Sequence, residues 1–293
     1  MDGVIVVDKP AGWTSHDVVA KLRRLAQERS IGHLGTLDPL ATGVLPLIAG
    51  RATRLARFFT ANDKRYEATV EFGITTDSYD RDGEVTATSP GFSLEREQVE
   101  AALADFRGTF LQTPPVVSAK KIGGVPAYKL ARRKIDVAMK PVEVTVFSLE
   151  LLELDGVRAR LRIHCGGGTY VRSIAHDLGQ KLGCGGIVET LRRTSSGDFT
   201  IEQARTMPEL QALSEAGDIL SAVIPAARLL PQFPSERVDV ITAGHIRQGR
   251  DFRVSPFRSR PDTKFIKAVN GDGELLAIGQ AKMPNLYHPI LVL

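Results

Sequence analysis

Apolar and polar residues follow two different periods along this chain, and the two periods predict both strands and helices. Residues 3–7 form an unbroken apolar run typical of a buried strand. Residues 64–73 alternate between polar and apolar side chains, as in a strand with one buried face. Residues 14–29 instead repeat apolar side chains every three or four positions, which predicts a helix capped by Thr14 or Ser15.

The same two periods predict further elements along the chain. We expect a strand at residues 44–50, a hairpin made of residues 142–154 and 157–165, and helices at residues 51–59, 93–106 and 168–183. Helices and strands that are mixed in this way predict an α+β fold, in which helices flank a central mixed, largely antiparallel sheet.

A change in composition near residue 230 predicts a second, smaller unit. Residues 229–236 contain two prolines and are typical of a linker. Beyond them we expect one helix and two short strands, at residues 237–249, 264–270 and 274–283. The chain is therefore expected to consist of a larger domain, residues 1–230, and an independently folded β-rich domain, residues 231–293.

Charge is concentrated in one segment. The net charge of +4 and the isoelectric point near 9.1 favour nucleic-acid binding only weakly. Residues 118–140, however, carry seven basic residues against the single acidic residue Asp136, a surplus of six, and Tyr128 lies among them. This composition fits an RNA-binding surface, although an ordinary solvated helix face would have it too.

Other features exclude some classes of protein. No apolar run approaches the roughly 20 residues of a membrane span, and the first residues lack the pattern of a signal peptide, so we expect a cytoplasmic protein without membrane contact. Cys165 and Cys184 lack the CxxC spacing of a zinc site. His164 and Cys165 would point to opposite faces of a strand. We therefore expect no metal site.

Residues 32–47, "GHLGTLDPLATGVLPL", hold a single carboxylate, Asp38, in a loop rich in glycine and proline. Pro39 disfavours helical geometry at Asp38, and the glycines let the backbone turn. The carboxylate could be a nucleophile, a general base, a metal ligand or simply a turn former. A catalytic role needs partners from elsewhere in the chain. The candidates are Tyr66, Tyr170 and Arg172, because an arginine would keep a carboxylate ionised and oriented.

Six segments taken together carry more information than any one of them. They are residues 3–19 ("GVIVVDKPAGWTSHDVV"), residues 32–47, residues 63–83 ("DKRYEATVEFGITTDSYDRDG"), residues 114–132 ("PPVVSAKKIGGVPAYKLAR"), residues 165–186 ("CGGGTYVRSIAHDLGQKLGCGG") and residues 191–197 ("LRRTSSG"). These segments resemble the bacterial tRNA pseudouridine-55 synthases, the TruB-type pseudouridine synthase family. The resemblance covers about residues 3–205.

The resemblance implies a domain organisation and a reaction. Residues 1–230 would form the catalytic domain, with an RNA-binding insertion at about residues 110–140, and residues 231–293 would form a PUA-like RNA-binding domain. The reaction would isomerise uridine to pseudouridine at position 55, in the T loop of tRNA. It detaches uracil at N1 and rejoins it through C5 with no cofactor. The partner would be the T arm of tRNA, bound by a monomer with the uridine flipped out.

The resemblance also implies roles for particular residues. Asp38 would be the nucleophile, Tyr66 would stack on the base as a candidate acceptor of the C5 proton, and Arg172 would pair with Asp38. The implied substrate- and RNA-binding residues are Lys9, His33, Asp80, Lys120, Lys121, Tyr128, Arg132, Arg133 and Tyr170. Among these, Lys9 would support the catalytic region, His33 would enter the T loop, and Asp80 would contact the RNA or the flipped nucleotide.

Three departures from the family pattern concern the rim of the pocket, and one of them is Gly167, which precedes Gly168 where family members more usually have a polar or basic residue. Val117 stands where family members commonly have an aromatic residue before "SA", and Gly186 stands where they often have alanine. None of these departures involves Asp38, Tyr66 or Arg172.

Other functions predict different residues. A protein that only binds or folds RNA would need the basic segment and the tail but not Asp38. A glycoside hydrolase would need a second carboxylate, such as Asp77 or Asp80, and sugar-binding clefts are usually rich in tryptophan, whereas this chain has only Trp13. A nucleobase deaminase is excluded, because the H-x-E and P-C-x-x-C pattern is missing.

Overall fold

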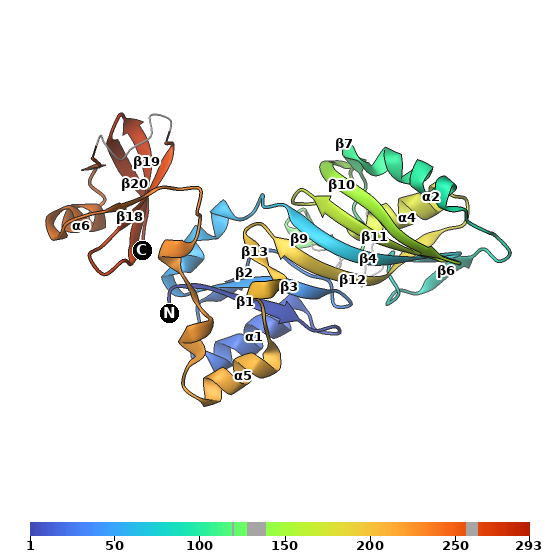
Figure 1. Cartoon of the computed structure of the whole chain (residues 1–293), viewed down its shortest axis with the longest axis horizontal. Coiled ribbons are helices and arrows are strands. Elements are labelled where there is room, and N and C mark those ends of the chain that lie inside the picture. Colours follow the sequence, from blue (N-terminus) through green and yellow to red (C-terminus); the bar gives the residue numbers. More distant parts are fainter. Residues whose placement is uncertain (119, 128–138, 256–262) are drawn as a thin grey trace.

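A long mixed sheet extends through most of the molecule (Figure 1). The computed structural model describes residues 1–118, 120–127, 139–255 and 263–293, and within these the sheet has eleven strands. They are β1 (Gly3–Lys9), β2 (Ile31–His33), β3 (Thr42–Ala49), β4 (Lys64–Phe72), β7 (Gly108–Gln112), β10 (Val142–Asp155), β11 (Arg158–Cys165), β12 (Gly186–Ser196), β13 (Phe199–Thr200), β14 (Arg205–Thr206) and β15 (Ile224–Pro225).

Strand β12 joins the two halves of this sheet. The main order is β14-β1-β3-β12-β4-β11-β10-β7. β12 runs parallel to β3 and antiparallel to β4, and the other neighbours are antiparallel except for the pair β1–β14. The mixed, largely antiparallel sheet that the sequence predicted is confirmed. No strand was predicted over β12 itself.

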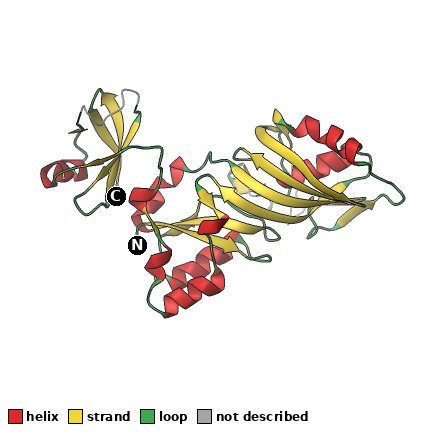
Figure 2. Cartoon of the chain, in the orientation of Figure 1, coloured by secondary structure: helices red, strands yellow, loops and turns green. Residues whose placement is uncertain are grey.

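Helices cover the sheet and share one apolar core (Figure 2). They are α1 (Ser15–Leu25), α2 (Arg96–Leu103), α4 (Val171–Lys181) and α5 (Met207–Glu215). Thr14 caps α1 by accepting a hydrogen bond from the Asp17 amide, while Asp17 accepts one from the Thr14 amide in return. In the described residues, no helix is both long and apolar enough to cross a membrane.

Shorter elements fill the connections. The helix predicted at residues 51–59 is a 3₁₀ helix, η1 (Gly50–Phe58). The other 3₁₀ segments are η2 (Ala104–Phe106), η3 (Ile201–Gln203), η4 (Ile219–Ala222) and η5 (Ala226–Arg228). Two small hairpins pair β5 (Ile74–Thr76) with β6 (Val85–Thr88) and β8 (Lys121–Ile122) with β9 (Val125–Pro126).

The end of the chain forms a second sheet with its own helix. The order is β16 (Ser235–Arg237), β18 (Phe265–Val269), β19 (Leu275–Met283), β20 (Leu286–Val292) and β17 (Phe252–Arg253), accompanied by α6 (Val240–Arg247). The predicted helix and both predicted strands are present. The boundary near residue 230 stays a prediction.

The second sheet also packs against the first part of the chain. Leu275, Ile278 and Leu291 belong to the same buried apolar cluster as Ile48 and Leu55. The tail is therefore attached through a shared core as well as through its linker.

Candidate functional site

Backbone contacts on both sides of Asp38 fix the loop that carries it. The Leu37 amide donates a 2.9 Å hydrogen bond to Ser15 Oγ, which lies at the start of α1, and the Ala41 amide donates to the Asp38 carbonyl at 3.1 Å. Leu37 is buried in the core, whereas the Asp38 side chain is 33% exposed. Gly43, the second residue of β3, has a φ of +99°, and a Cβ atom there would lie 2.2 Å from the Arg193 carbonyl oxygen.

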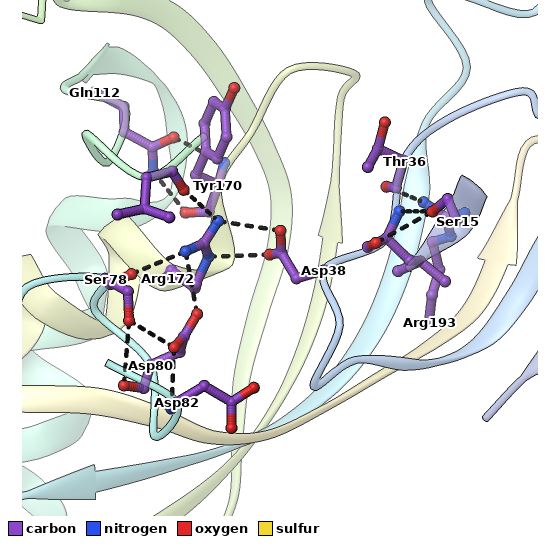
Figure 3. A network of polar contacts seen from close by, with 12 residues as sticks. Ser15, Thr36, Asp38, Ser78, Asp80, Asp82, Gln112, Tyr170, Arg172 and Arg193 are labelled. Atoms are coloured by element: carbon purple, nitrogen blue, oxygen red, sulfur yellow. Dashed lines mark hydrogen bonds and ion pairs between the residues drawn. The ribbon is translucent and has the colours of Figure 1, made fainter. Parts of the chain in front are cut away.

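Asp38 and Arg172 meet through two contacts, although they are 134 positions apart in the sequence (Figure 3). Arg172 Nη2 donates to Asp38 Oδ1 at 3.0 Å, and Arg172 Nε lies 2.9 Å from Asp38 Oδ2. The Arg172 side chain is 5% exposed and sits in the first turn of α4. A planar guanidinium that faces both carboxylate oxygens fixes the carboxylate in orientation as well as in position.

Arg172 is itself held by three other acceptors. Its Nη1 donates to the Ser78 carbonyl at 2.9 Å and to Asp80 Oδ2 at 3.1 Å, and its Nη2 also donates to the Val117 carbonyl at 3.0 Å. The position that departs from the family pattern, Val117, therefore contributes its backbone carbonyl to the site.

Asp80 is a second carboxylate on the same guanidinium. Its side chain is 6% exposed, and its Oδ1 accepts hydrogen bonds from Ser78 Oγ at 2.6 Å and from the Asp82 amide at 3.2 Å. The contact with Arg172 was not foreseen from the sequence. The predicted contact of Asp80 with RNA stays a prediction, and the carboxylate lies beneath the surface, directed at Arg172.

Opposing effects act on the pKa of Asp38. Burial raises the pKa of the carboxyl, and the charge of Asp80 raises it further, whereas the Arg172 guanidinium and the more distant Lys9 lower it. The side chain is still one-third exposed and is bound at both oxygens. The pKa of Asp38 is raised overall, and the two-point contact with Arg172 offsets part of that rise by stabilising the ionised form, which is the form that a nucleophile needs.

Gln112 forms two hydrogen bonds with the backbone of Tyr170, directly before α4 begins. Gln112 Nε2 donates to the Tyr170 carbonyl at 3.0 Å, and the Tyr170 amide donates back to Gln112 Oε1 at 2.8 Å. One turn further on, Ser173 Oγ donates to the Thr113 carbonyl at 2.7 Å. Burial raises the pKa of the Tyr170 phenol. These bonds set the starting point of the helix that carries Arg172.

Tyr66 lies on β4 directly opposite Arg193 of β12. The Tyr66 residue is 7% exposed, and burial raises the pKa of its phenol while the nearby Arg193 guanidinium lowers it. The ring therefore stays neutral at physiological pH and offers an apolar face from the sheet.

Lys9 holds the Asp38 loop against the start of the chain. It is fully buried, and its Nζ donates to the carbonyls of Pro10 at 2.9 Å, Trp13 at 2.6 Å and Pro39 at 3.1 Å. Burial lowers the pKa of Lys9 to about 8, although the Asp38 charge acts in the opposite direction. The ammonium thus connects the residue next to Asp38 to the turn that precedes α1.

His33 lies at the end of β2, beside His16, with ring centroids 5.6 Å apart. Burial lowers the pKa of His33, and the charges of His16 and Arg193 lower it further. Its Nδ1 is buried without a hydrogen-bond partner. A neutral imidazole results, and its predicted entry into the T loop stays a prediction.

The structure describes only part of the predicted basic surface. Lys120 Nζ donates to the Lys140 carbonyl at 3.3 Å, and Lys121 lies on β8. Tyr128, Arg132 and Arg133 lie outside the described residues. Within the described residues, no group of three or more His, Cys, Asp or Glu side chains could hold a metal ion.

Sequence reasoning did not single out Ser78, Gln112 or Arg193. Arg193 Nε donates to the Val44 carbonyl at 2.7 Å, and its two terminal nitrogens donate to the carbonyls of Gly35 and Thr36. The available signal was the pair of arginines within residues 191–197, where a polar segment follows the apolar residues of β12.

Comparisons with known proteins agree on one family. The model of the TruB family pseudouridylate synthase (N-terminal domain) matches residues 23–171, and that of the tRNA pseudouridylate synthase B C-terminal domain matches residues 172–230. The tRNA pseudouridine synthase B of Solibacter usitatus is 58% identical over 293 residues, which is the full length of both chains. The protein of the same name from Aquifex aeolicus is 38% identical over 284 residues, or 96% of each chain.

The fold has a counterpart among solved structures. A chain in the crystal structure of the archaeal box H/ACA sRNP Nop10–Cbf5 complex superposes with a TM-score of 0.68 and 26% identity, over 96% of this chain and 79% of that chain. The fold, the matching family models and the full-length relatives lead to the same assignment. The chain belongs to the TruB family of pseudouridylate synthases.

Proposed function

We propose that this enzyme isomerises uridine to pseudouridine at position 55, in the T loop of tRNA, with Asp38 as the nucleophile. The observation that carries this proposal is the Asp38 carboxylate itself, one-third exposed and bound at both oxygens by a buried arginine. The relatives that match over the full chain are named tRNA pseudouridine synthase B, which supports tRNA as the substrate.

The reaction requires few groups from the protein. The C1′–N1 bond of uridine breaks, the uracil turns, and a C1′–C5 bond forms. The C5 proton leaves and N1 gains a proton, so the change is redox-neutral and needs no cofactor. Asp38 acts on the uridine as an ionised nucleophile, and Arg172 directs it. The buried charge of Asp80 keeps the guanidinium in place while the substrate enters.

Two aromatic residues can bind a uracil that has flipped out of the stacked bases of the RNA. Tyr66 offers a ring on the sheet, and Tyr170 offers one at the start of α4. A flipped uracil can stack on such rings, which offsets part of the cost of unstacking it from the RNA. Tyr66 is also the candidate acceptor of the C5 proton; its phenol would have to ionise for that step, and the positive charge of Arg193 favours the ionised form.

Binding of the tRNA body would use surfaces outside this pocket. The basic residues of segment 118–140 would contact phosphates, and the tail domain would add contacts with the RNA. We propose that the enzyme acts as a cytoplasmic monomer. The alternative function is RNA binding or folding without catalysis, which would use the same surfaces but would not need the Asp38–Arg172 pair.

The exchange Asp38→Asn separates these two functions. It keeps shape and polarity but removes the nucleophile, so single-turnover tritium release from tRNA labelled at uridine C5 should fall by about a thousandfold or more. The Kd for tRNA should stay within a few-fold of the original value. Asp105→Asn is the matched control, because Asp105 lies exposed on η2, where it pairs with Lys181 of α4. Near-normal release by Asp38→Asn would refute the proposed nucleophile.

The position of the modified uridine needs a separate measurement. Pseudouridine should be mapped in tRNA from cells that lack this protein, and it should be lost at T-loop position 55 alone. A wild-type copy should restore it, and an Asp38→Asn copy should not. Loss at other positions would assign a different substrate site.

A further inference from the structure

Arg193 is a buried cation without a carboxylate partner among the described residues. The residue is 1% exposed and lies in the second half of β12. A guanidinium in a protein interior is normally paired with a carboxylate, because removing its charge from water is costly. Here the described acceptors are three backbone carbonyls, those of Val44 at 2.7 Å, Gly35 at 3.0 Å and Thr36 at 3.2 Å.

These three carbonyls flank Asp38 on both sides of its loop. Gly35 and Thr36 precede Asp38, and Val44 follows it as the loop enters β3. Figure 3 shows Arg193 beside Thr36, while Arg172 approaches Asp38 from the other side. Arg193 thus connects both arms of the loop to the central strand of the sheet, and Arg172 then meets a carboxylate whose backbone is already fixed.

The charge of Arg193 also acts on the pocket. Tyr66 is its cross-strand neighbour, so the two side chains project from the same face of the sheet. The guanidinium lowers the pKa of the Tyr66 phenol and also lowers the pKa values of Lys9, His33 and Lys64. Four titratable groups around the site therefore experience a positive charge that no described carboxylate pairs with.

We propose that Arg193 is a positioning residue for the isomerisation: it fixes the loop that presents Asp38 and places an unpaired positive charge beside Tyr66. This inference rests on the proposed function, in which Asp38 and Tyr66 act on the flipped uridine. A uracil that leaves through N1 carries negative charge, so a pocket biased toward anions favours that step. The guanidinium is needed for the loop, because each carbonyl accepts from a different nitrogen of Arg193, and the single nitrogen of a lysine cannot occupy all three donor positions.

Two substitutions separate the loop contacts from the charge. Arg193→Lys keeps the positive charge but loses the planar guanidinium with its separate donor nitrogens. Arg193→Gln removes the charge. Each should lower the single-turnover rate by about tenfold to a hundredfold, because a small displacement of a reacting group has effects of that size. The Kd for tRNA should stay within threefold. Arg192→Gln is the matched control, since Arg192 lies next on the same strand with a half-exposed side chain paired with Asp8.

Two further readouts do not depend on turnover. Hydrogen exchange at the Leu37 and Ala41 amides should become at least tenfold faster in both Arg193 variants and should be unchanged in Arg192→Gln. The chain has five tyrosines, and fluorotyrosine labelling should give five ¹⁹F signals, of which Tyr66→Phe identifies one. In Arg193→Gln the Tyr66 phenol should titrate at higher pH than in the wild type, whereas Arg193→Lys should shift this titration less.

The outcomes distinguish this inference from the proposed function. If the wild type releases no tritium from tRNA, the proposed function fails, and the exchange and ¹⁹F results still decide whether Arg193 positions the loop. Turnover within threefold of the wild type, together with unchanged exchange and an unchanged Tyr66 titration, would overturn the inference. Failure of both Arg193 variants to fold, while Arg192→Gln folds normally, would also overturn it, because Arg193 would then determine the fold rather than the site.

Discussion

Arg172 contacts both oxygens of Asp38 and simultaneously donates to Asp80, so one guanidinium lies between two carboxylates (Figure 3). Asp80 is almost fully buried, whereas Asp38 is one-third exposed. Only one of the two acids can therefore reach a substrate from this position. Asp80, the buried acid, anchors Arg172, and Asp38, the partly exposed acid, is the one presented to the substrate.

Arg172→Lys tests whether the planar shape of the Arg172 guanidinium matters in addition to its positive charge. An ammonium cannot replace the contacts that Arg172 makes with Asp38, Asp80 and the Ser78 carbonyl. We expect the single-turnover rate to fall by about a hundredfold or more, with little change in tRNA affinity. Arg158→Lys serves as the control, because Arg158 forms half-exposed pairs with Glu71 and Glu189 on the sheet. A rate within a few-fold of the wild type would remove Arg172 from the proposed mechanism.

Asp80→Asn should change the pH dependence of the reaction. The charge of Asp80 raises the pKa of Asp38, so its removal should lower that pKa. Because Asp38 must be ionised to act, the acid limb of the rate profile should move to lower pH. The rate at the pH optimum should fall by about tenfold, since Arg172 loses an anchor.

Single-turnover rates between pH 4 and pH 8 would check the effect of Asp80→Asn. Asp105→Asn should leave the acid limb in place, because that residue is exposed and pairs with Lys181. An acid limb that stays fixed or moves to higher pH in Asp80→Asn would contradict the assigned coupling between the two acids.

Lys9 should contribute to stability through its three carbonyl contacts. Lys9→Met removes the hydrogen bonds to the half-buried carbonyls of Pro10, Trp13 and Pro39, of which Pro39 keeps a second donor, the Gly12 amide at 2.8 Å. We expect a loss of about 3 kcal/mol in the free energy of unfolding. Urea denaturation at pH 7 measures this loss, with Lys21→Met as the control, because the hydrogen bond from Lys21 of α1 to Gln211 is exposed to solvent. A loss equal to that of the control would contradict this role.

The contribution of Lys9 should also depend on pH in a defined direction. Its pKa is about 8 in the folded protein, below its ordinary value of 10.5. Between these two values the unfolded chain binds more protons than the folded chain, so the wild type should gain stability relative to Lys9→Met as the pH rises from about 8 to 10.5. Urea denaturation of both proteins across that window checks the sign. A difference that shrinks with rising pH would show that the pKa of Lys9 is not lowered.

The sequence predicted the elements whose burial follows the hydrophobic period. β4 has buried and less buried residues in strict alternation, and α1 has its cap at Thr14, one of the two predicted positions. Sequence reasoning also identified Asp38, Tyr170 and Arg172 as partners, through their glycine-rich surroundings and the family resemblance. The structure places Asp38 in contact with Arg172, and Tyr170 lies two residues before Arg172, as the N-cap of α4.

What the sequence could not show is burial of polar side chains. β12 lacks an apolar alternation in its second half because Arg193 and Ser196 are its buried residues there. The acidic turn that contains Asp80 resembles a solvated surface loop, although Asp80 is buried against an arginine that lies 92 positions away. Pairings of this kind depend on tertiary contacts, which local periodicity does not record.

Affinity for tRNA should depend on salt through the basic segment. Exchange of Lys120, Lys121, Arg132 and Arg133 together for glutamine should weaken binding and flatten the plot of log Kd against log salt. Each lost phosphate contact should lower the slope by roughly 0.7 to 0.9. Titrations between 50 and 300 mM salt measure this slope, and glutamine at Arg158, Arg160 and Arg162 is the control, because these arginines pair with glutamates on the sheet. An unchanged slope would place the RNA contacts elsewhere.

The tail should unfold together with the catalytic part of the chain, because the two share an apolar cluster. Leu291 packs in the cluster that includes Ile48 and Leu55, whereas Leu276 lies in a cluster formed within the tail. Arg54 also donates to the Val292 carbonyl, and Lys267 Nζ donates to the Leu229 carbonyl at 2.8 Å. These contacts bind the two parts together.

We therefore expect Leu291→Ala to cost about 2 to 5 kcal/mol and to lower the midpoint of a single calorimetric transition. Leu276→Ala is the matched comparison, since the same side chain is removed from the tail's own core. If the tail folds independently, as its linker predicted, Leu276→Ala should instead lower one of two separate transitions. A chain that ends at Leu230 would then keep the unfolding midpoint of the catalytic part and its turnover at saturating tRNA. Loss of both would show that the tail is needed to complete the apolar core of the catalytic part.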